Sequence, residues 1–174
     1  MVNKVKIKDI IRISVLVALV AIFSQISLPM PHGIPITMQV FAIALVSQLL
    51  KPFYAFVCIT IYILLGAFGV PVFANFSGGI ERIIGPTGGF IFGFYILSYI
   101  LSLTQKTNKF YKILFTIIAV ILFHFIGVVH YSVVMKTTII NSFLIVSAPL
   151  FFKDIILIYI AILISKKLNR NTTV

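Results

Sequence analysis

Charged residues are so rare along this chain that the apolar stretches between them mark its elements. Long charge-free stretches cover residues 13–50, 52–80, 83–105 and 113–135. A helix needs about 20 mainly apolar residues to cross a bilayer, and a shorter one can cross when flanking lysines extend to the interface. The first stretch is long enough for two helices, because prolines and a glycine interrupt it near residue 30. The pattern therefore predicts six membrane-spanning helices, at about residues 9–27, 37–50, 53–68, 89–104, 110–133 and 150–168.

Four connections between these helices differ in character. Residues 28–36 hold three prolines and are expected to form a loop, and Lys51-Pro52 predicts a tight turn. Residues 69–89 are rich in glycine. Residues 135–149 are expected to form a partly helical, re-entrant segment that ends at Pro149, because proline cannot continue a helix that needs its N–H group.

Composition supports an all-α integral membrane protein with one transmembrane domain, residues 1–174. Apolar residues make up 61% of the chain and charged residues only 10%, and the mean hydropathy is +1.19. Soluble domains carry roughly 25% charged residues, so a water-soluble enzyme is excluded, as is a disordered chain. The net charge of +11 would suit nucleic acid, but lysines that flank membrane spans give the same sum. We expect membrane lipid, and no nucleic acid, as a partner.

The distribution of Lys and Arg predicts the orientation. Six spans place both termini and two short connections on one side, which then carries eleven of the fourteen cations. By the positive-inside bias this side faces the cytoplasm, so we expect a multi-pass protein of the plasma membrane with both termini inside. The first apolar run lacks a small-residue cleavage site and continues into the first helix, so no cleaved signal is expected.

The outer connections hold most of the unusual residues. Eight of the ten glycines lie between residues 66 and 93, and two of the three acids, Glu81 and Asp154, are also outside. Irregular backbone at membrane depth must be buried in protein or line a wet cavity. The segment therefore indicates an outward-facing cavity, with simple loop flexibility as the alternative. Asp154 is a candidate functional group, or else it complements a helix N-terminus or pairs with Lys153.

Other polar residues give weaker signals. Asn75 could donate and accept hydrogen bonds in a pocket, or it could be an ordinary turn residue. Arg82 and Lys136 could attract a carboxylate or meet lipid headgroups. Ser14, Ala18 and Ala21 share one face of the first helix, where small residues allow close approach, either to another subunit or within the bundle; internal packing is favoured by the residues alone.

Catalytic and metal chemistry find little support. His124 and His130 are six residues apart and do not share a helix face, and with His32 as the third histidine we expect no metal site. The lone cysteine, Cys58, lies in an apolar run and offers no disulfide framework. No phosphate-binding loop is present, no Ser-His-Asp arrangement stands out, and the few acids leave little room for acid–base catalysis. We expect neither an enzyme nor a cofactor.

Three outer segments together resemble the BioY family, the substrate-binding S components of energy-coupling factor transporters for biotin. The first is the Pro35-Ile36-Thr37-Met38-Gln39 segment, and the second runs from Gly66 through Ser77-Gly78-Gly79 to Phe90. The third is Pro149 followed five residues later by Asp154. The resemblance covers most of the chain from the first helix onward.

The resemblance implies a six-helix S component that captures biotin from outside. Such proteins work with a transmembrane coupling subunit and two cytoplasmic ATPases. They are thought to topple in the membrane, with small residues of the first helix against the coupling subunit. Ser14, Ala18 and Ala21 would then be partner-binding residues, although the family's motif there is richer in alanine.

The resemblance also implies ligand contacts. Asn75 and Asp154 match the family's residues for the ureido ring, with Asp154 accepting its N–H groups. The thiophane and valeryl carbons are expected against Phe73, Phe76 and Tyr95. The family's lysine for the carboxylate is replaced by Leu157, which is a departure because an unpaired buried carboxylate is costly. We expect Lys153, Arg82 or Lys136 to substitute, with a carboxylate that stays nearer solvent as the alternative.

Two other functions stay open. Leu157 favours an S component for another vitamin or a biotin precursor as an alternative ligand class. A small membrane enzyme or lipid-interacting structural protein that uses the outer cavity is the alternative from a different class.

Overall fold

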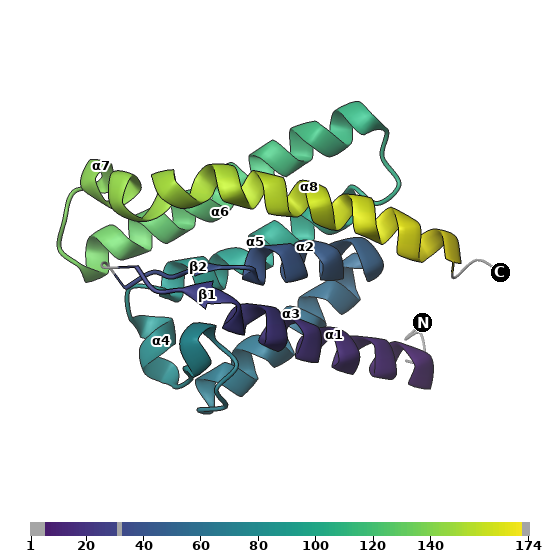
Figure 1. The fold of residues 1–174 in the computed structure, drawn as a ribbon, viewed down its shortest axis with the longest axis horizontal. Helices are drawn as coiled ribbons and strands as arrows, with labels where there is room; N and C mark the ends of the chain where they lie inside the picture. Colours follow the sequence, from purple (N-terminus) through teal and green to yellow (C-terminus); the bar gives the residue numbers. More distant parts are fainter. Residues whose placement is uncertain (1–5, 31–32, 172–174) are drawn as a thin grey trace.

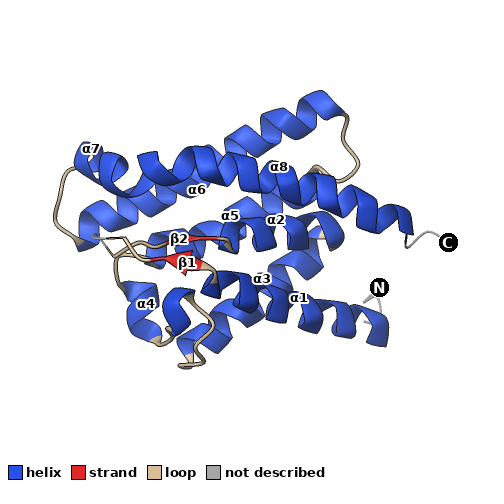
Figure 2. Ribbon diagram, in the orientation of Figure 1, coloured by secondary structure: helices blue, strands red, loops and turns tan. Residues whose placement is uncertain are grey.

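Six long helices form the body of the structure. The computed structural model describes residues 6–30 and 33–171, with side chains up to residue 169; Lys4, Pro31 and the predicted non-ligand His32 lie outside these ranges. The predicted six-helix fold is confirmed (Figures 1 and 2). Its helices are α1 (Ile7–Gln25), α2 (Gln39–Leu49), α3 (Pro52–Ala67), α5 (Gly88–Leu103), α6 (Lys109–Val134) and α8 (Ala148–Asn171).

Helix α2 is the centre of the bundle. Every residue from Gln39 to Gln48 is buried, and the helix packs against α8, α5 and α1. Its 11 residues rise only about 16 Å, roughly half the hydrocarbon thickness of a bilayer. A helix surrounded by protein does not need to reach both membrane interfaces. An extended segment continues from its N-terminal end toward one end of the bundle.

Helices α5 and α6 approach each other through glycines. A Cβ atom at Gly89 would lie 2.8 Å from the carbonyl oxygen of Ile126, and one at Gly127 would lie 2.5 Å from the ring of Phe90. Small residues allow such close packing between membrane helices. This close contact determines where Phe90 of α5 and Phe123 of α6 lie.

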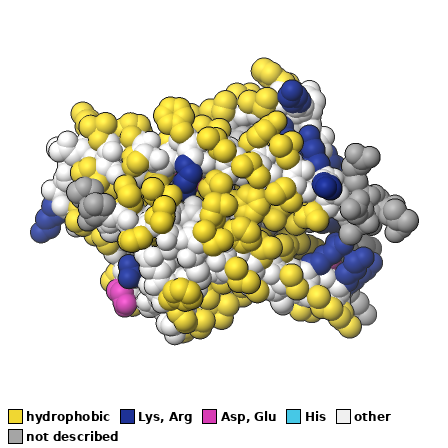
Figure 3. Space-filling model, viewed as in Figure 1, with side chains coloured by type: hydrophobic (Ala, Val, Ile, Leu, Met, Phe, Trp, Pro, Cys, Tyr) yellow, Lys and Arg dark blue, Asp and Glu magenta, His cyan; other side chains and the backbone are white. Residues whose placement is uncertain are grey.

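The outer surface of the bundle is apolar. α6 and the segment Ile139–Asn169 are both long and apolar enough to cross a bilayer, and α2, α3 and α5 are shorter apolar helices. Large hydrophobic side chains cover the face seen in Figure 3, and most of the visible basic side chains gather at the end where α1 begins and α8 ends. This surface is that of a membrane protein.

The segment between α1 and α2 differs from the predicted simple loop. Ser27–Leu28 (β1) and Ile36–Thr37 (β2) pair as two short antiparallel strands, with Ser27 opposite Thr37. The predicted helices 9–27 and 37–50 are each shorter at this end, because Ile26 accepts a hydrogen bond from the backbone of Met38 at 3.0 Å. The hairpin folds back over the end of the bundle.

Residues 135–149 also differ from the prediction, because they are not a separate re-entrant piece ending at Pro149. A short helix, α7 (Ile139–Ser142), passes through a π-helical turn, η2 (Phe143–Ser147), directly into α8. Proline removes an N–H group and its ring clashes with the carbonyl four residues earlier. The wider π turn immediately before Pro149 accommodates both effects.

The glycine-rich segment is mostly ordered into short elements. A 3-10 turn, η1 (Ala74–Phe76), precedes the one-and-a-half-turn helix α4 (Ile80–Ile84). Phe73 and Ser77 exchange backbone hydrogen bonds at 2.9 and 3.3 Å and close a small loop around η1. This loop, α4 and the hairpin lie together at the end of the bundle opposite the end of α8 (Figure 1).

Candidate functional site

A cavity lies at this end of the bundle, beneath the hairpin and the Phe73–Ser77 loop. Its volume is about 90 Å³. The apolar part of the wall includes four phenylalanines from three regions of the chain, Phe73, Phe90, Phe94 and Phe123. The polar part comes from the hairpin, α2, the Phe73–Ser77 loop, α4, the N-cap of α5 and α8, through Thr37, Gln39, Asn75, Ser77, Arg82, Thr87, Lys153 and Asp154. The cavity wall thus combines aromatic and polar side chains.

Asp154 is the most deeply buried charged group of the cavity wall. It is only 1% exposed, and the ammonium nitrogen of Lys153 lies 2.7 Å from its Oδ1 atom. Lys153 also donates a hydrogen bond to the carbonyl oxygen of Thr37 at 2.9 Å. Among the described residues, Asp154 Oδ1 has no partner with hydrogen-bond geometry. A buried acceptor in this state can take an N–H group from a ligand.

Asn75 is held in an unusual backbone conformation at the mouth of the cavity. Asn75 and Phe76 have φ angles of 58° and 52°, in the left-handed region that most residues avoid. The hydroxyl of Ser27 donates to Asn75 Oδ1 at 2.7 Å. Because the oxygen is occupied, the amide NH₂ group is the part of Asn75 that can donate to a ligand.

Gln25, the last residue of α1, fixes the same loop. Its Oε1 atom accepts the N–H group of Phe76 at 2.8 Å, and its Nε2 atom donates to the carbonyl oxygen of Val72 at 3.3 Å. The side chain therefore satisfies backbone groups on two sides of the loop. α1 and the Asn75 loop are physically joined at this point.

A buried polar chain supports the floor of the cavity. Gln39 donates through Nε2 to the hydroxyl of Tyr62 at 2.6 Å, and Tyr62 donates to the carbonyl oxygen of Val72 at 3.1 Å. Ser24 lies 2.9 Å from the same hydroxyl. Satisfied buried networks of this kind define a single arrangement of the surrounding helices.

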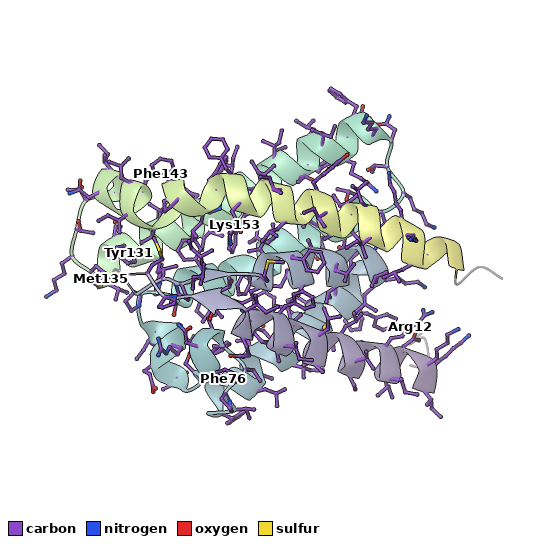
Figure 4. All side chains as sticks on the ribbon, viewed as in Figure 1. Arg12, Phe76, Tyr131, Met135, Phe143 and Lys153 are labelled. Atoms are coloured by element: carbon purple, nitrogen blue, oxygen red, sulfur yellow. The ribbon has the colours of Figure 1, made fainter. Side chains whose placement is uncertain are left out.

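The structure brings together five of the seven residues expected at the ligand site: Phe73, Asn75, Arg82, Lys153 and Asp154 all line the cavity. Phe76 does not: it is 73% exposed, and Figure 4 shows it at the outer edge of the loop. Tyr95 does not line the cavity either. Its hydroxyl bonds Thr60 on α3 at 3.2 Å, between α5 and α3.

Other expected contacts are distributed as follows. Leu157 is buried but absent from the cavity wall, whereas Lys153, one helical turn earlier, reaches it. Lys136 is exposed, follows α6 and is also not part of the wall. On α1, Ser14 and Ala18 are exposed and Ala21 is half-buried, so the first two do not pack inside this bundle.

Sequence reasoning missed several residues of the site. Gln39 stands in a motif that was recognised but given no role, and Phe90, Phe94 and Phe123 gave no separate signal in uniformly apolar helices. His124 and Ser147 were also missed: Ser147 Oγ lies 2.9 Å from His124 Nδ1, and His124 Nε2 lies 3.3 Å from Asp154 Oδ2. The sequence showed no Ser-His-Asp arrangement because the packing of α6 against α8 creates it. Ser147 is fully buried and does not line the cavity.

Comparison with known proteins agrees with this architecture. The chain is 34% identical over 167 residues, 96% of its length and 99% of the relative's, to a probable biotin transporter BioY of Pyrococcus horikoshii. It is 36% identical over 102 residues, 59% of this chain and 60% of the relative, to the biotin transporter BioY of Thermotoga maritima.

The fold agrees with a solved structure as well. A crystal structure of the S-component for biotin from an ECF-type ABC transporter superimposes with a TM-score of 0.84 and 23% identity, covering 98% of this chain and 95% of that one. The profile of the BioY family matches residues 1–173. The chain is therefore a member of the BioY family.

Proposed function

We propose that this chain is the S component of a biotin-uptake system: it captures biotin at the outer face of the plasma membrane and delivers it with an ATP-driven energy-coupling module. The observation that carries the proposal is the pair of half-buried Lys153 and buried Asp154 on the wall of an aromatic cavity. Membership in the BioY family supports the ligand class. The chain would act as a binding and translocating subunit, not as an enzyme.

The chemistry of biotin fits the aromatic and polar groups of the cavity wall. Its ureido ring offers two N–H donors and one carbonyl acceptor, which match the Oδ1 atom of Asp154 and the amide NH₂ of Asn75. Its thiophane ring and valeryl chain are apolar and would lie against Phe73, Phe90 and Phe123. Its carboxylate would be neutralised by Lys153, whose ammonium would leave Oδ1 of Asp154 and so open that oxygen to the ureido ring, with Arg82 as a second cation at the mouth.

The partners follow from the same assignment. A transmembrane coupling subunit and two ATPase subunits would complete the transporter, and the exposed small residues Ser14 and Ala18 of α1 offer a face that another membrane helix can approach closely. Ala21, half-buried on the next turn, extends this face. We place both termini in the cytoplasm, because the ends of α1 and α8 that carry most of the cations lie at the same end of the bundle.

The proposal is tested by titrating the purified protein with biotin in a calorimeter. We expect the wild-type chain to bind biotin, and Asp154→Asn to weaken binding by at least about tenfold, because a charged acceptor of the ureido N–H groups is replaced by an amide that also brings its own donors. Asp9→Asn makes the same change near the far end of α1 and should bind like the wild type. Normal binding by the Asp154 variant would contradict the site.

A second ligand class is favoured by one observation, the leucine at position 157. A competition experiment distinguishes biotin from another ligand: bound labelled biotin is challenged with unlabelled desthiobiotin, other vitamins or biotin itself. If a precursor or another vitamin binds more tightly than biotin, the chain is an S component for that molecule.

A further inference from the structure

Two buried polar atoms on facing side chains lack hydrogen bonds in the described part of the chain. They are Nε2 of His124, which is 3% exposed, and Oδ1 of Asp154, which faces the Lys153 ammonium at 2.7 Å without hydrogen-bond geometry. The Nε2 atom lies 3.3 Å from the other carboxylate oxygen, Oδ2. Buried polar groups are normally satisfied. Both unsatisfied atoms belong to one carboxylate–imidazole contact, which points to a contact that is completed when the cavity is filled.

The Asp154 carboxylate determines which nitrogen of His124 carries the proton, and the Ser147 hydroxyl can bond the other nitrogen. A proton on Nδ1 would leave the lone pair of Nε2 facing the carboxylate, which is repulsive. With the proton on Nε2, the ring donates toward Asp154 and accepts the Ser147 hydroxyl at Nδ1, 2.9 Å away. A second hydrogen bond commonly fixes the tautomer of a functional histidine in this way.

The surroundings also fix the plane of the ring. Phe90 and Phe123 meet it edge to face, with centroids 6.0 and 5.1 Å away, and Phe151 lies at 5.2 Å. Ser147 comes from the π-helical turn η2, and such turns often re-aim a side chain at a functional site. Ser147 of η2 thus holds His124 of α6, and His124 contacts the Asp154 carboxylate of α8.

We propose that His124 is a positioning residue for ligand recognition, held by Ser147, and that it orients the Asp154 carboxylate so that Oδ1 meets the N–H groups of a cyclic urea. His124 does not line the ligand cavity and acts only through Asp154. When a ligand N–H group binds Oδ1, the carboxylate can turn to align Oδ2 with the Nε2–H group, which satisfies both atoms at once. This inference rests on the proposed function.

A double-mutant cycle tests the proposal by biotin calorimetry. His124→Phe should weaken biotin binding by about tenfold or more, since it removes a hydrogen bond to a charged group. His124→Gln should restore part of the loss, because its amide can donate to Oδ2. In the Asp154→Asn background, His124→Phe should cause no further loss. Losses that simply multiply in the double variant would overturn the positioning role.

Two measurements keep the test decisive if His124→Phe does not fold. Ser147→Ala frees the ring and should weaken biotin binding several-fold, whereas Ser98→Ala, at a buried serine of α5 outside the cavity wall, should not. Nitrogen-15 NMR of labelled histidine should show His124 as the Nε2–H tautomer, with a shift on biotin addition. Wild-type protein that fails to bind biotin would refute the proposed function; wild-type binding that survives Ser147→Ala and His124→Gln unchanged would refute only this inference.

Discussion

We propose that Lys153 replaces, one helical turn earlier, the cation that the family pattern places at position 157. Its ammonium group lies between Asp154 Oδ1 and the carbonyl oxygen of Thr37, and it would leave Oδ1 to bind a ligand carboxylate. We expect Lys153→Met to weaken binding of biotin by about 10- to 100-fold, and to weaken binding of the neutral biotin amide much less. Calorimetry with both ligands measures this difference.

Arg82→Gln is the matched control for this charge, because Arg82 also lines the cavity but is exposed to solvent. Solvent screening should limit its effect to a few-fold. If the preference for biotin over its amide is lost in Arg82→Gln and kept in Lys153→Met, the carboxylate is bound by Arg82 and the assignment to Lys153 is wrong.

Single residues of the site were predictable where their chemistry is rare in a membrane chain. Asp154 is one of three acids, and a buried acid gives a strong signal. Phenylalanine gives almost none, because it is common on lipid-facing and cavity-facing surfaces alike. The prediction of Phe76 and Tyr95 as cavity residues is wrong in position, because a strained loop turns Phe76 outward and the hydroxyl of Tyr95 bonds Thr60 of α3.

At the scale of elements, Gln25 at the end of α1 holds the Asn75 loop in place through hydrogen bonds to its backbone. Left-handed backbone at a bulky residue such as Phe76 costs on the order of 1–3 kcal/mol, and Gln25 offsets this cost by bonding its N–H group. We expect Gln25→Ala to let the loop relax and to weaken biotin binding by about tenfold, with helix content by circular dichroism unchanged.

Gln105→Ala is the control for this substitution. Gln105 also donates from its side chain to backbone carbonyls, those of Ser47 and Leu50, but it lies beyond α5 at the opposite end of the bundle. It should leave affinity for biotin unaltered. If the two variants lose affinity for biotin equally, glutamine–backbone contacts stabilise the bundle generally. The contact of Gln25 with the Asn75 loop would then have no specific role in binding.

The boundaries of a helix were predictable where a charged residue or a proline in the sequence marks its end. Lys109 and the cation-free run after Lys112 placed α6 within a residue of its true limits. The hairpin was not predictable, because two-residue strands have no hydrophobic period of their own and form only where the helix ends bring them together. Pro149 was misread as a terminator, because the π turn that tolerates it leaves no mark in the sequence.

At the scale of the whole molecule, every proposed step depends on which side of the membrane the cavity faces. Glu81, exposed on α4 near the cavity, should lie outside, and Lys106, exposed between α5 and α6, should lie inside. Glu81 is a better labelling site than Gly78, where a Cβ atom would lie 2.5 Å from the carbonyl oxygen of Val70. The native Cys58 is buried and should react slowly.

We therefore expect an impermeant maleimide to label Glu81→Cys in intact cells and to label Lys106→Cys only after the membrane is opened. The charge asymmetry predicts this result, since the Lys106 side, termini and loops together, carries eleven of the fourteen cations. The reverse pattern would place the cavity in the cytoplasm, where capture of an external ligand is impossible. Labelling of both variants in intact cells would instead show mixed insertion, which a chain with so uneven a distribution of lysines should not permit.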